Sequence, residues 1–230
     1  MATVSVGLFK SSLGRKYLMA ISGLFLCTFL IVHCIGNLQL FKDDGGQAFN
    51  EYTYFMTHNP LIKFVSYVNY ILILLHVIDG FSLVMANKKA RPQAYANVDQ
   101  SKSSTWSSRN MGILGTLILI FLIVHMRSFW FEMKFGSMPI INYDGSDIAY
   151  KDMYKIVAEA FTQVWYVALY VICMFALAFH LFHGFQSAFQ TFGINHHRYT
   201  PVIKAIGVGV FAIIIPALFA AMPLFFLLNN

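Results

Sequence analysis

The stretch AFHLFHGFQSAFQTFG, Ala178–Gly193, lies near the end of the longest uncharged segment of the chain. No Asp, Glu, Lys or Arg occurs between Glu159 and Arg198, and this length and composition predict a helix that spans a membrane. His180 and His183 lie deep within that helix. Imidazole in hydrocarbon must be paired, hydrogen-bonded or bound to a metal, so both histidines are candidate functional residues that need a partner.

The composition extends this prediction to the whole chain. Of its residues, 58% are hydrophobic and 11% are charged, whereas soluble domains carry about 25% charged residues. We therefore expect an all-α membrane protein with a single transmembrane domain over residues 1–230. Cys27, Cys34 and Cys173 lie in apolar runs without a CxxC or CxxCH motif. This pattern argues against a disulfide framework, a structural zinc site and c-type haem, and favours small packing residues.

Five apolar segments predict five transmembrane helices. They are expected at about residues 17–40, 61–86, 111–131, 160–190 and 205–228. The first apolar segment is too long for a signal peptide, so we expect an uncleaved span. Between the spans, we expect a polar loop at residues 41–60 and a partly helical surface segment at residues 132–155. Pro216 and Pro223 predict kinks in the last span.

The basic residues predict how the chain is oriented in the membrane. One side of the five spans receives ten of them: Lys10, Arg15, Lys16, Lys88, Lys89, Arg91, Lys102, Arg109, Arg198 and Lys204. The other receives six: Lys42, Lys63, Arg127, Lys134, Lys151 and Lys155. Eight of the ten acidic residues accompany these six, leaving Asp99 on the first side and Asp79 within a span. We therefore expect a cytoplasmic N-terminus and a periplasmic C-terminus. The net charge of +6 is interpreted as this topology signal, and no nucleic-acid partner is expected.

Four spans each carry a histidine at depth, and the depths form two pairs. Counted from the cytoplasmic side, His33 and His125 lie 16 and 14 residues into their spans, or about 21 to 24 Å at the rise of an α-helix. His76 and His180 each lie 10 residues from the cytoplasmic ends of their spans, or about 15 Å. Two level pairs on different helices are what two bis-histidine b-type haems require, because each iron takes one imidazole from either side of the porphyrin.

Two glycines support the second pair. His76 is followed at i+4 by Gly80, and His180 by Gly184, so each histidine has a glycine one turn away on the same helix face, where a flat macrocycle needs clearance. His183 is ambiguous. It could be a rival ligand, a hydrogen-bond partner of a haem propionate or quinone, or a packing residue, and we favour the last two because only His180 has the glycine at i+4.

Several other polar residues are weaker candidates. Asp79 is the one acidic residue well inside a span; it could support His76 or handle protons, or it could simply be protonated or hydrogen-bonded. Arg127 could extend to the membrane surface or pair with a propionate. Three further histidines are expected in loops at the surface: His58, His196 and His197. Two of them, His58 and His197, are also candidates for a quinone site or an interface. Glu51, His58 and Arg127 are candidates for an outer quinone site from depth alone.

The chain resembles a known family, the dihaem cytochrome b membrane anchors of succinate:quinone oxidoreductases. It is similar to the five-helix form, which has one large anchor subunit. These enzymes include succinate dehydrogenase and fumarate reductase. The resemblance covers nearly the whole chain. It rests on GRKYLMAISGLFL at residues 14–26 ahead of His33, on one histidine position in each of the first four spans, and on an H-x3-G-x8-G motif that starts at His180.

The resemblance implies a set of cofactors and partners. Two haems b would be held by His33 with His125 and by His76 with His180. A flavoprotein subunit and an iron–sulfur subunit would dock on the cytoplasmic face of a bacterial inner membrane, and a quinone, with menaquinone favoured, would react within the membrane lipid. Some menaquinol-oxidising relatives carry a glutamate two residues before the fourth ligand. Ala178 occupies that position here, so the proton route through that carboxylate is not carried over.

The resemblance does not distinguish succinate oxidation from fumarate reduction, since both use the same residues, and the chain alone is not expected to oxidise succinate. Two alternatives from the residues stay open. The first is the cytochrome b subunit of a membrane hydrogenase or formate dehydrogenase, which would have the same haem spectrum and different partners. The second is a haem-free, proton-coupled transporter with a histidine relay, in which Asp79 and His76 would be central.

Overall fold

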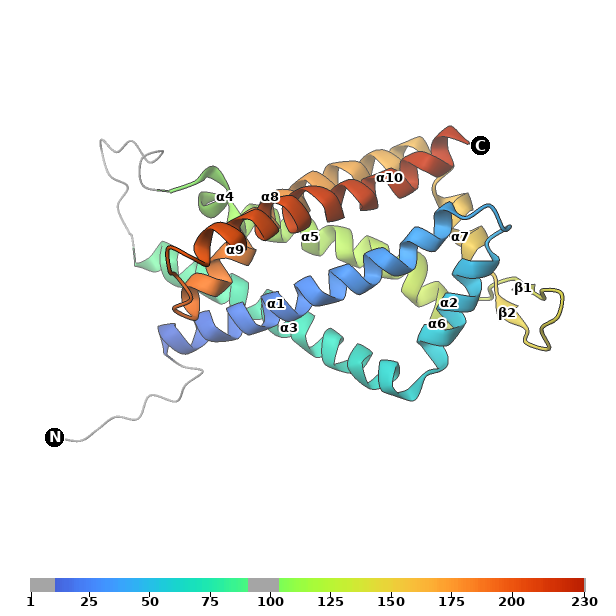
Figure 1. Cartoon of the computed structure of the whole chain (residues 1–230), viewed down its shortest axis with the longest axis horizontal. Helices are drawn as coiled ribbons and strands as arrows, with labels where there is room; N and C mark the ends of the chain where they lie inside the picture. The colour runs from blue at the N-terminus through green and yellow to red at the C-terminus, as the bar shows by residue number, and fades with distance from the viewer. Residues whose placement is uncertain (1–10, 91–103, 230) are drawn as a thin grey trace.

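The computed structural model describes residues 11–90 and 104–229 of the chain, and Figure 1 shows that helices dominate them. Five helical stretches are long and apolar enough to cross a membrane, which confirms the predicted all-α membrane class. They are α1 (Ser12–Asn37) with η2 (Leu38–Phe41); α3 (Pro60–Lys89); α5 (Met111–His125) with η4 (Met126–Phe131) and α6 (Glu132–Phe135); α8 (Val164–Thr191); and α9 (Thr200–Ile206) with η5 (Gly207–Ile214) and α10 (Ile215–Leu228).

The ends of the spans differ from the predicted ones where capping residues intervene. Ser11 accepts a hydrogen bond from the backbone N–H of Gly14, so α1 begins several residues before the expected position 17. Asn59 caps α3 in the same way, with Pro60 in its first turn, where a proline is well tolerated. The fourth span begins at Val164 rather than 160, because the chain turns after a separate short helix.

Two spans change from α-helical to π-helical hydrogen bonding. The turn η4 follows His125 directly, and η5 lies immediately before α10, in which Pro216 is the second residue. Proline lacks an N–H and its ring clashes with the carbonyl four residues earlier, here that of Ala212. The irregularity expected at Pro216 therefore takes the form of a π-helical turn. Pro223 lies inside α10, which continues as an α-helix to Leu228.

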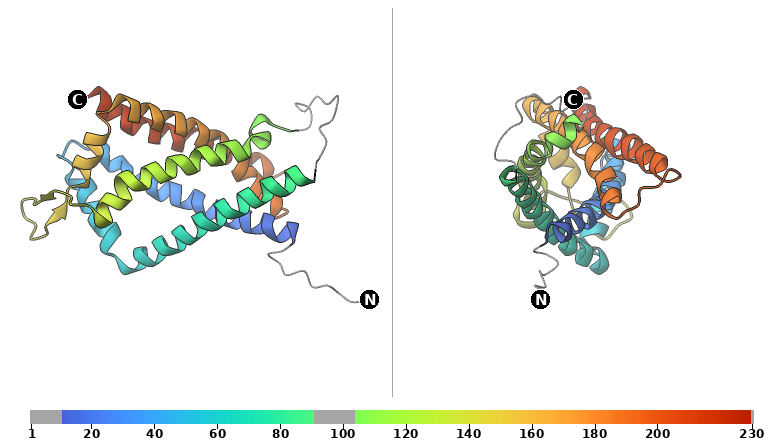
Figure 2. Two further views of the ribbon diagram at one scale, coloured as in Figure 1. Left: turned by 180° about the vertical axis from the view of Figure 1, so that it is seen from behind. Right: turned by 90° about the vertical axis from the view of Figure 1, so that its left-hand side faces the viewer.

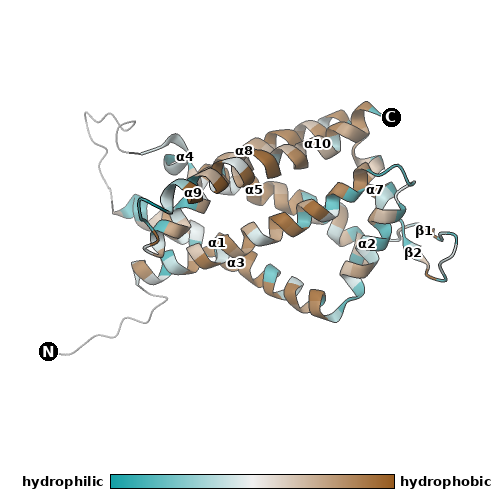
Figure 3. Ribbon diagram, viewed as in Figure 1, coloured by the Kyte–Doolittle hydropathy of each residue, from teal (hydrophilic) through white to brown (hydrophobic). Residues whose placement is uncertain are grey.

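Four of the spans form a ring. α1 packs against α3, α3 against α5, α5 against α8, and α8 against α1. The fifth span packs outside this ring, with η5 and α10 against α8 and α10 also against α1. The end-on view in Figure 2 shows this arrangement, and Figure 3 shows apolar residues along the spans with hydrophilic residues concentrated towards the ends. Two pairs of helices are thus diagonally opposite, α1 with α5 and α3 with α8.

Two apolar clusters fill the bundle. The larger lies near the end that contains η4 and the C-terminus of α10, and includes Phe129, Tyr170 and Phe226. In the smaller, Phe185 of α8 stacks on Phe211 of η5 with ring centroids 4.6 Å apart. All three cysteines are buried and unpaired, as expected for packing residues.

A small unit of short helices and strands, which we call the cap, covers one end of the bundle. It consists of α2 (Gln47–His58), β1 (Ile140–Ile141), β2 (Tyr150–Lys151) and α7 (Met153–Ala160). The two strands pair antiparallel, with Ile140 opposite Lys151. The prediction of a simple loop at residues 41–60 was wrong, because residues 47–58 form a helix. The expectation of a partly helical surface segment at 132–155 is confirmed, although that segment also contains the hairpin.

A single buried amide ties the cap together. Asn50 of α2 donates hydrogen bonds to the Tyr143 hydroxyl at 2.8 Å and to the Asp152 carboxylate at 3.0 Å, and it accepts one from the backbone N–H of Tyr154 at 2.9 Å. Its exposed fraction is 1%. Burial raises the pKa of the Tyr143 phenol, the hydrogen bond with Asn50 partly opposes that rise, and the nearby Asp152 carboxylate adds to it.

Several of the basic residues used in the topology prediction lie at the end of the bundle opposite the cap. α1 begins at the end opposite the cap, and α10 finishes at the cap end (Figure 1). Arg15 and Lys16 lie in the first turns of α1, and Lys88 and Lys89 in the last turn of α3. Four residues used in that prediction lie outside the described residues: Lys10, Arg91, Asp99 and Lys102.

Candidate metal centres

The first centre is an imidazole pair near the cap, which we call the outer pair. His33 lies near the end of α1, and His125 is the last residue of α5. Their ring centroids are 5.8 Å apart with an interplanar angle of 89°. Aromatic rings surround them: Phe29 and Phe219 contact His33, and Phe121, Phe129 and Tyr170 contact His125. The outer pair therefore lies in an apolar, aromatic environment.

The second centre, the inner pair, lies towards the opposite end of the bundle. His76 of α3 and His180 of α8 have ring centroids 6.3 Å apart, at an interplanar angle of 67°. Two glycines approach these rings. A Cβ added at Gly23 of α1 would lie 3.3 Å from His76 Cε1, and one added at Gly115 of α5 would lie 3.8 Å from His180 Cε1. The inner pair is thus enclosed by the same two helices that carry the outer pair.

Each pair joins diagonally opposite helices of the ring. His33 and His125 come from α1 and α5, and His76 and His180 from α3 and α8. The pairing expected from helix depth is therefore observed in space. Gly23 and Gly115 each precede an outer histidine by ten residues, which corresponds to about 15 Å along a helix. The two centres are stacked along the bundle axis at roughly that separation.

The Ser22 hydroxyl of α1 contacts a ring nitrogen of His76. The Ser22 hydroxyl lies 2.8 Å from the carbonyl of Leu18 and 3.0 Å from His76 Nδ1. A hydroxyl has one hydrogen, and the carbonyl can only accept it. When the hydroxyl donates to that carbonyl, Ser22 Oγ can accept a hydrogen bond from Nδ1–H of His76. In this tautomer, Nε2 keeps its lone pair and is available as a metal ligand.

A tyrosine pair supports His125 in a similar manner. The Tyr170 hydroxyl lies 3.2 Å from His125 Nδ1 and 3.1 Å from the Tyr166 hydroxyl. Tyr170 can accept a hydrogen bond from Nδ1–H while it donates to Tyr166, which again leaves Nε2 free. Asn37 donates to the His33 carbonyl at 2.8 Å, and its side-chain nitrogen lies 3.4 Å from His33 Nδ1. That second contact is long, so it does not fix the tautomer of His33.

His180 differs from the other three histidines because its Nδ1 atom is buried and has no hydrogen-bond partner among the described residues. An unsatisfied buried polar atom carries a free-energy cost. Its ring faces His76, and His183 lies three residues further along the same helix. A Cβ added at Gly184 would meet nothing within 4 Å, whereas one at Gly80 would meet the flexible Met19 side chain at 3.5 Å. The predicted clearance is thus present beside His180, while Gly80 makes an ordinary packing contact.

The remaining histidines are not part of either pair. His183 is half-buried, and no ring of the described residues packs against it. His58 belongs to the cap, where its Nδ1 bonds the Tyr54 carbonyl at 2.8 Å. His196 and His197 are exposed in the connection between α8 and α9, with ring centroids 4.2 Å apart.

The charged candidates also lie outside the two pairs. Asp79 is buried in α3, and its Oδ2 has no hydrogen-bond partner among the residues that the structure describes. Arg127 forms an ion pair with Glu132 and lies over the Phe131 ring, so it is occupied at the surface. Glu51 is exposed on α2 and accepts a hydrogen bond from Gln47. The three suggested quinone-site residues, Glu51, His58 and Arg127, therefore have different surroundings.

Each pair has the spacing of two imidazoles that share one metal. A histidine nitrogen lies about 2 Å from a metal that it binds, so two rings on opposite sides of one metal have centroids about 6 Å apart. No group of three or more His, Cys, Asp or Glu side chains that could hold a metal occurs within residues 11–90 and 104–229. A metal at either pair would therefore take only two ligands from the protein.

Sequence reasoning missed four residues around the pairs. Gly23 and Gly115 could have been found from their identical ten-residue spacing to His33 and His125, which places each glycine beside the other centre. Ser22 and Tyr170 gave no comparable signal. A serine or a tyrosine within a span is common, and its partner depends on how the helices are rotated.

No protein-family model, no curated protein and no solved structure matches this chain.

Proposed function

We infer that this chain is the membrane anchor and electron-transfer subunit of a succinate:quinone oxidoreductase and binds two haems b. The observation that carries this proposal is the presence of two imidazole pairs, 5.8 and 6.3 Å between centroids, on diagonally opposite helices. A haem iron takes its two axial ligands from the protein and the rest from the porphyrin. Two centres with two histidines each match that requirement, whereas structural zinc takes four protein ligands.

The chain's own residues would perform three tasks. His33 with His125 would hold one haem and His76 with His180 the other, in each case through imidazole nitrogens. Ser22 and Tyr170 would orient His76 and His125 by accepting hydrogen bonds at Nδ1. The aromatic rings around the outer pair would exclude water and so affect the redox potential. When bound, each haem supplies reversible one-electron chemistry at iron.

In this proposal, a flavoprotein and an iron–sulfur subunit dock at the end opposite the cap. This end is cytoplasmic in the orientation predicted from the basic residues, and the membrane is a bacterial inner membrane. Electrons from succinate would reach a membrane quinone, with menaquinone favoured, in an enzyme of the respiratory chain. The chain alone would not oxidise succinate. His183 would contact a propionate or quinone, because it is half-buried beside the inner pair.

Asp79 gives some support to a second candidate, a haem-free proton-coupled transporter. It is a buried carboxyl group with an unpaired oxygen, three residues after His76 on α3, and intramembrane carboxyl groups commonly relay protons. The geometry of the histidine pairs favours the anchor subunit, since a proton relay does not require two imidazoles at metal-sharing distances on opposite helices.

Difference spectroscopy and copurification test the proposal together. We expect the chain, purified in mild detergent, to show a reduced-minus-oxidised spectrum of b-type haem with two haems per chain. A flavoprotein and an iron–sulfur protein with succinate dehydrogenase activity should copurify with it. Copurifying hydrogenase or formate dehydrogenase subunits would identify the other cytochrome b class, and a chain that contains no haem when isolated from haem-replete cells would support the transporter.

A further inference from the structure

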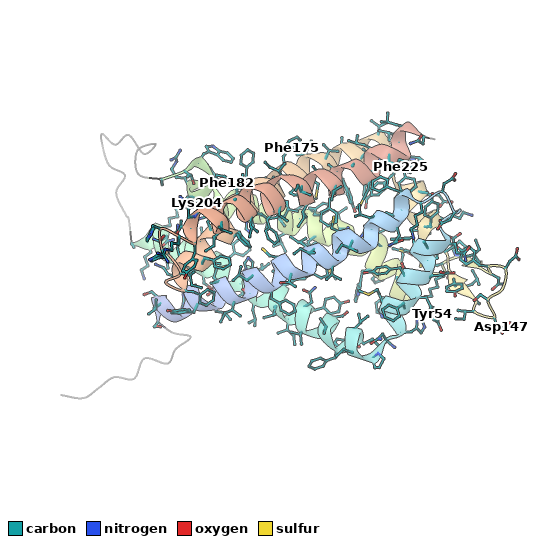
Figure 4. The ribbon with its side chains drawn as sticks, viewed as in Figure 1. Tyr54, Asp147, Phe175, Phe182, Lys204 and Phe225 are labelled. Atoms are coloured by element: carbon teal, nitrogen blue, oxygen red, sulfur yellow. The ribbon has the colours of Figure 1, made fainter. Side chains whose placement is uncertain are left out.

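A pocket of about 410 Å³ lies where the cap meets the bundle. Its lining comes from α2, the start of α3, α6 and the β1–β2 hairpin, and includes Tyr54, His58, Lys63, Met133, Lys134 and Lys151. Figure 4 shows Tyr54 at the cap end, remote from Lys204 at the other end of the molecule. Pockets of this size hold small ligands or ligand headgroups.

The charges that line this pocket all have one sign. Lys63, Lys134 and Lys151 contribute ammonium groups, and no carboxylate is found among the described lining residues. Lys151 donates to the Met133 carbonyl at 2.6 Å, while no hydrogen bond joins the ammonium group of Lys63 or Lys134 to another of the described residues; Lys63 bonds Asn59 through its backbone alone. Asp152, which bonds the lining residue Asn50, is occupied by that amide and by the backbone N–H of Lys155. An anion is the chemical match for this lining.

The surface next to the pocket is apolar and aromatic. Phe64 and Tyr67 follow Lys63 on α3, with exposed fractions of 65% and 66%, and Phe135 follows Lys134 with 68%. Trp130 of η4 donates to the Tyr70 hydroxyl at 2.8 Å, which links the third span to α3. Such aromatic residues are typical of the depth at which a membrane meets water. A ligand in the pocket would therefore have a charged group at the lysines and a hydrocarbon part on the spans.

We propose that this pocket binds the phosphate headgroup of an anionic phospholipid, with its acyl chains along the exposed surface of α3 and η4. Lys63, Lys134 and Lys151 contact the phosphate. A soluble anion would use the lysines but not the adjacent apolar surface, and a neutral quinone would use that surface but does not require three ammonium groups. A zwitterionic phospholipid binds more weakly, because its own cationic group opposes the lysines.

The test compares phosphatidylglycerol with phosphatidylcholine on the full-length chain in detergent, by native mass spectrometry of bound lipid. The wild type should bind its first molecule of phosphatidylglycerol more tightly than its first molecule of phosphatidylcholine with acyl chains of the same length. Each lysine near an anionic surface contributes about fivefold in affinity, so Lys63→Gln with Lys134→Gln should reduce this preference about 25-fold. These two lysines are chosen because neither ammonium group bonds another described residue, whereas the Lys151 ammonium supports the Met133 backbone.

Lys88→Gln with Lys89→Gln is the matched control, since it removes two lysines from the other end of α3 and should retain the preference. Lys63→Arg with Lys134→Arg keeps the charge and should bind as wild type, even if the glutamine pair folds poorly. Three results would overturn the proposal: equal binding of both lipids by the wild type, an unchanged preference in the glutamine pair, or displacement of phosphatidylglycerol by either inorganic phosphate or a quinone at comparable concentration.

Discussion

The Ser22 hydroxyl shows how one residue can prepare a histidine for metal binding. When it donates to a carbonyl of its own helix, its oxygen can accept a hydrogen bond from Nδ1–H of His76. That hydrogen bond favours the neutral tautomer with a free Nε2. It also increases the basicity of that nitrogen, because a hydrogen bond from Nδ1–H shifts electron density into the ring.

Ser22→Ala should therefore weaken the inner haem site without abolishing it. Loss of such a partner lowers metal affinity about 10- to 100-fold. We also expect a higher midpoint potential for the inner haem, since a less basic imidazole stabilises ferric iron less. Haem retention and redox titration measure both effects. Thr28→Ala is the control, because Thr28 also donates to a carbonyl of α1 but contacts no histidine; an equal effect there would remove the specific role of Ser22.

The two histidine pairs predict how many haems each histidine substitution removes. His33→Ala and His125→Ala should each lose the same outer haem, because either change leaves the iron with one axial ligand. His76→Ala and His180→Ala should each lose the inner haem. The measurement is the haem content and low-temperature α-band of each variant in membranes that still contain the protein.

His183→Ala is the matched control on the same helix, and it should keep both haems with, at most, a shifted potential. Retention of both haems in His180→Ala, with loss of one in His183→Ala, would move the ligand by three residues. That outcome would contradict the observed contact between the His76 and His180 rings.

Helix-level features of the sequence were only partly predictable. Length and hydropathy were sufficient for the five spans and, with the rise of an α-helix, for the relative depths of the four histidines. The rotation of each helix about its axis could not be predicted from the sequence. That rotation decides that Gly23 rather than Gly80 approaches His76. The helix α2 was missed because it is polar and lies outside the spans. The π-helical turn η4 contains no proline, so the sequence did not indicate it.

The glycine contacts predict which helix surfaces tolerate a side chain. Gly23→Leu should exclude the inner haem, since even a Cβ there would lie 3.3 Å from the His76 ring. Gly80→Leu should retain it, because its neighbour is the flexible end of Met19. Haem content with an assay for correctly inserted protein distinguishes the two. The reverse pattern would restore the explanation based on a glycine at i+4.

The cap should depend on Asn50 more than on any charged residue at its surface. Asn50→Ala removes three hydrogen bonds at a site that is 1% exposed and leaves buried polar groups without partners, at a cost of about 3 kcal/mol. We expect faster proteolysis within residues 41–60 and a lower melting temperature, while both haems are retained. Glu51→Ala, which affects an exposed neighbour on the same helix, should match the wild type. Equal protease sensitivity of the two variants would contradict this role.

At the scale of the whole molecule, the same ring of four helices forms both histidine pairs. Each helix of the ring carries one paired histidine, and three of them also border the other centre: Gly23 of α1 and Gly115 of α5 approach the inner rings, and the Tyr170 hydroxyl of α8 lies 3.2 Å from His125 Nδ1. This arrangement requires antiparallel neighbours, because the depths of His33 and His125 are counted from the starts of their helices and those of His76 and His180 from the ends. Topology and the candidate site are therefore one hypothesis.

Because the histidine pairs depend on the membrane topology, a test of the topology also tests the candidate site. With five spans, the first described turn of α1 and the end of α10 lie at opposite ends of the bundle, and the ten-to-six excess of basic residues favours a cytoplasmic start. A reporter fused to the C-terminus should therefore be periplasmic, and one inserted near Ser104, between the second and third spans, should be cytoplasmic. Alkaline phosphatase and green fluorescent protein fusions at both positions provide opposite readouts. If both positions fell on one side, one span would not cross, and the histidines could not be level in pairs within the membrane.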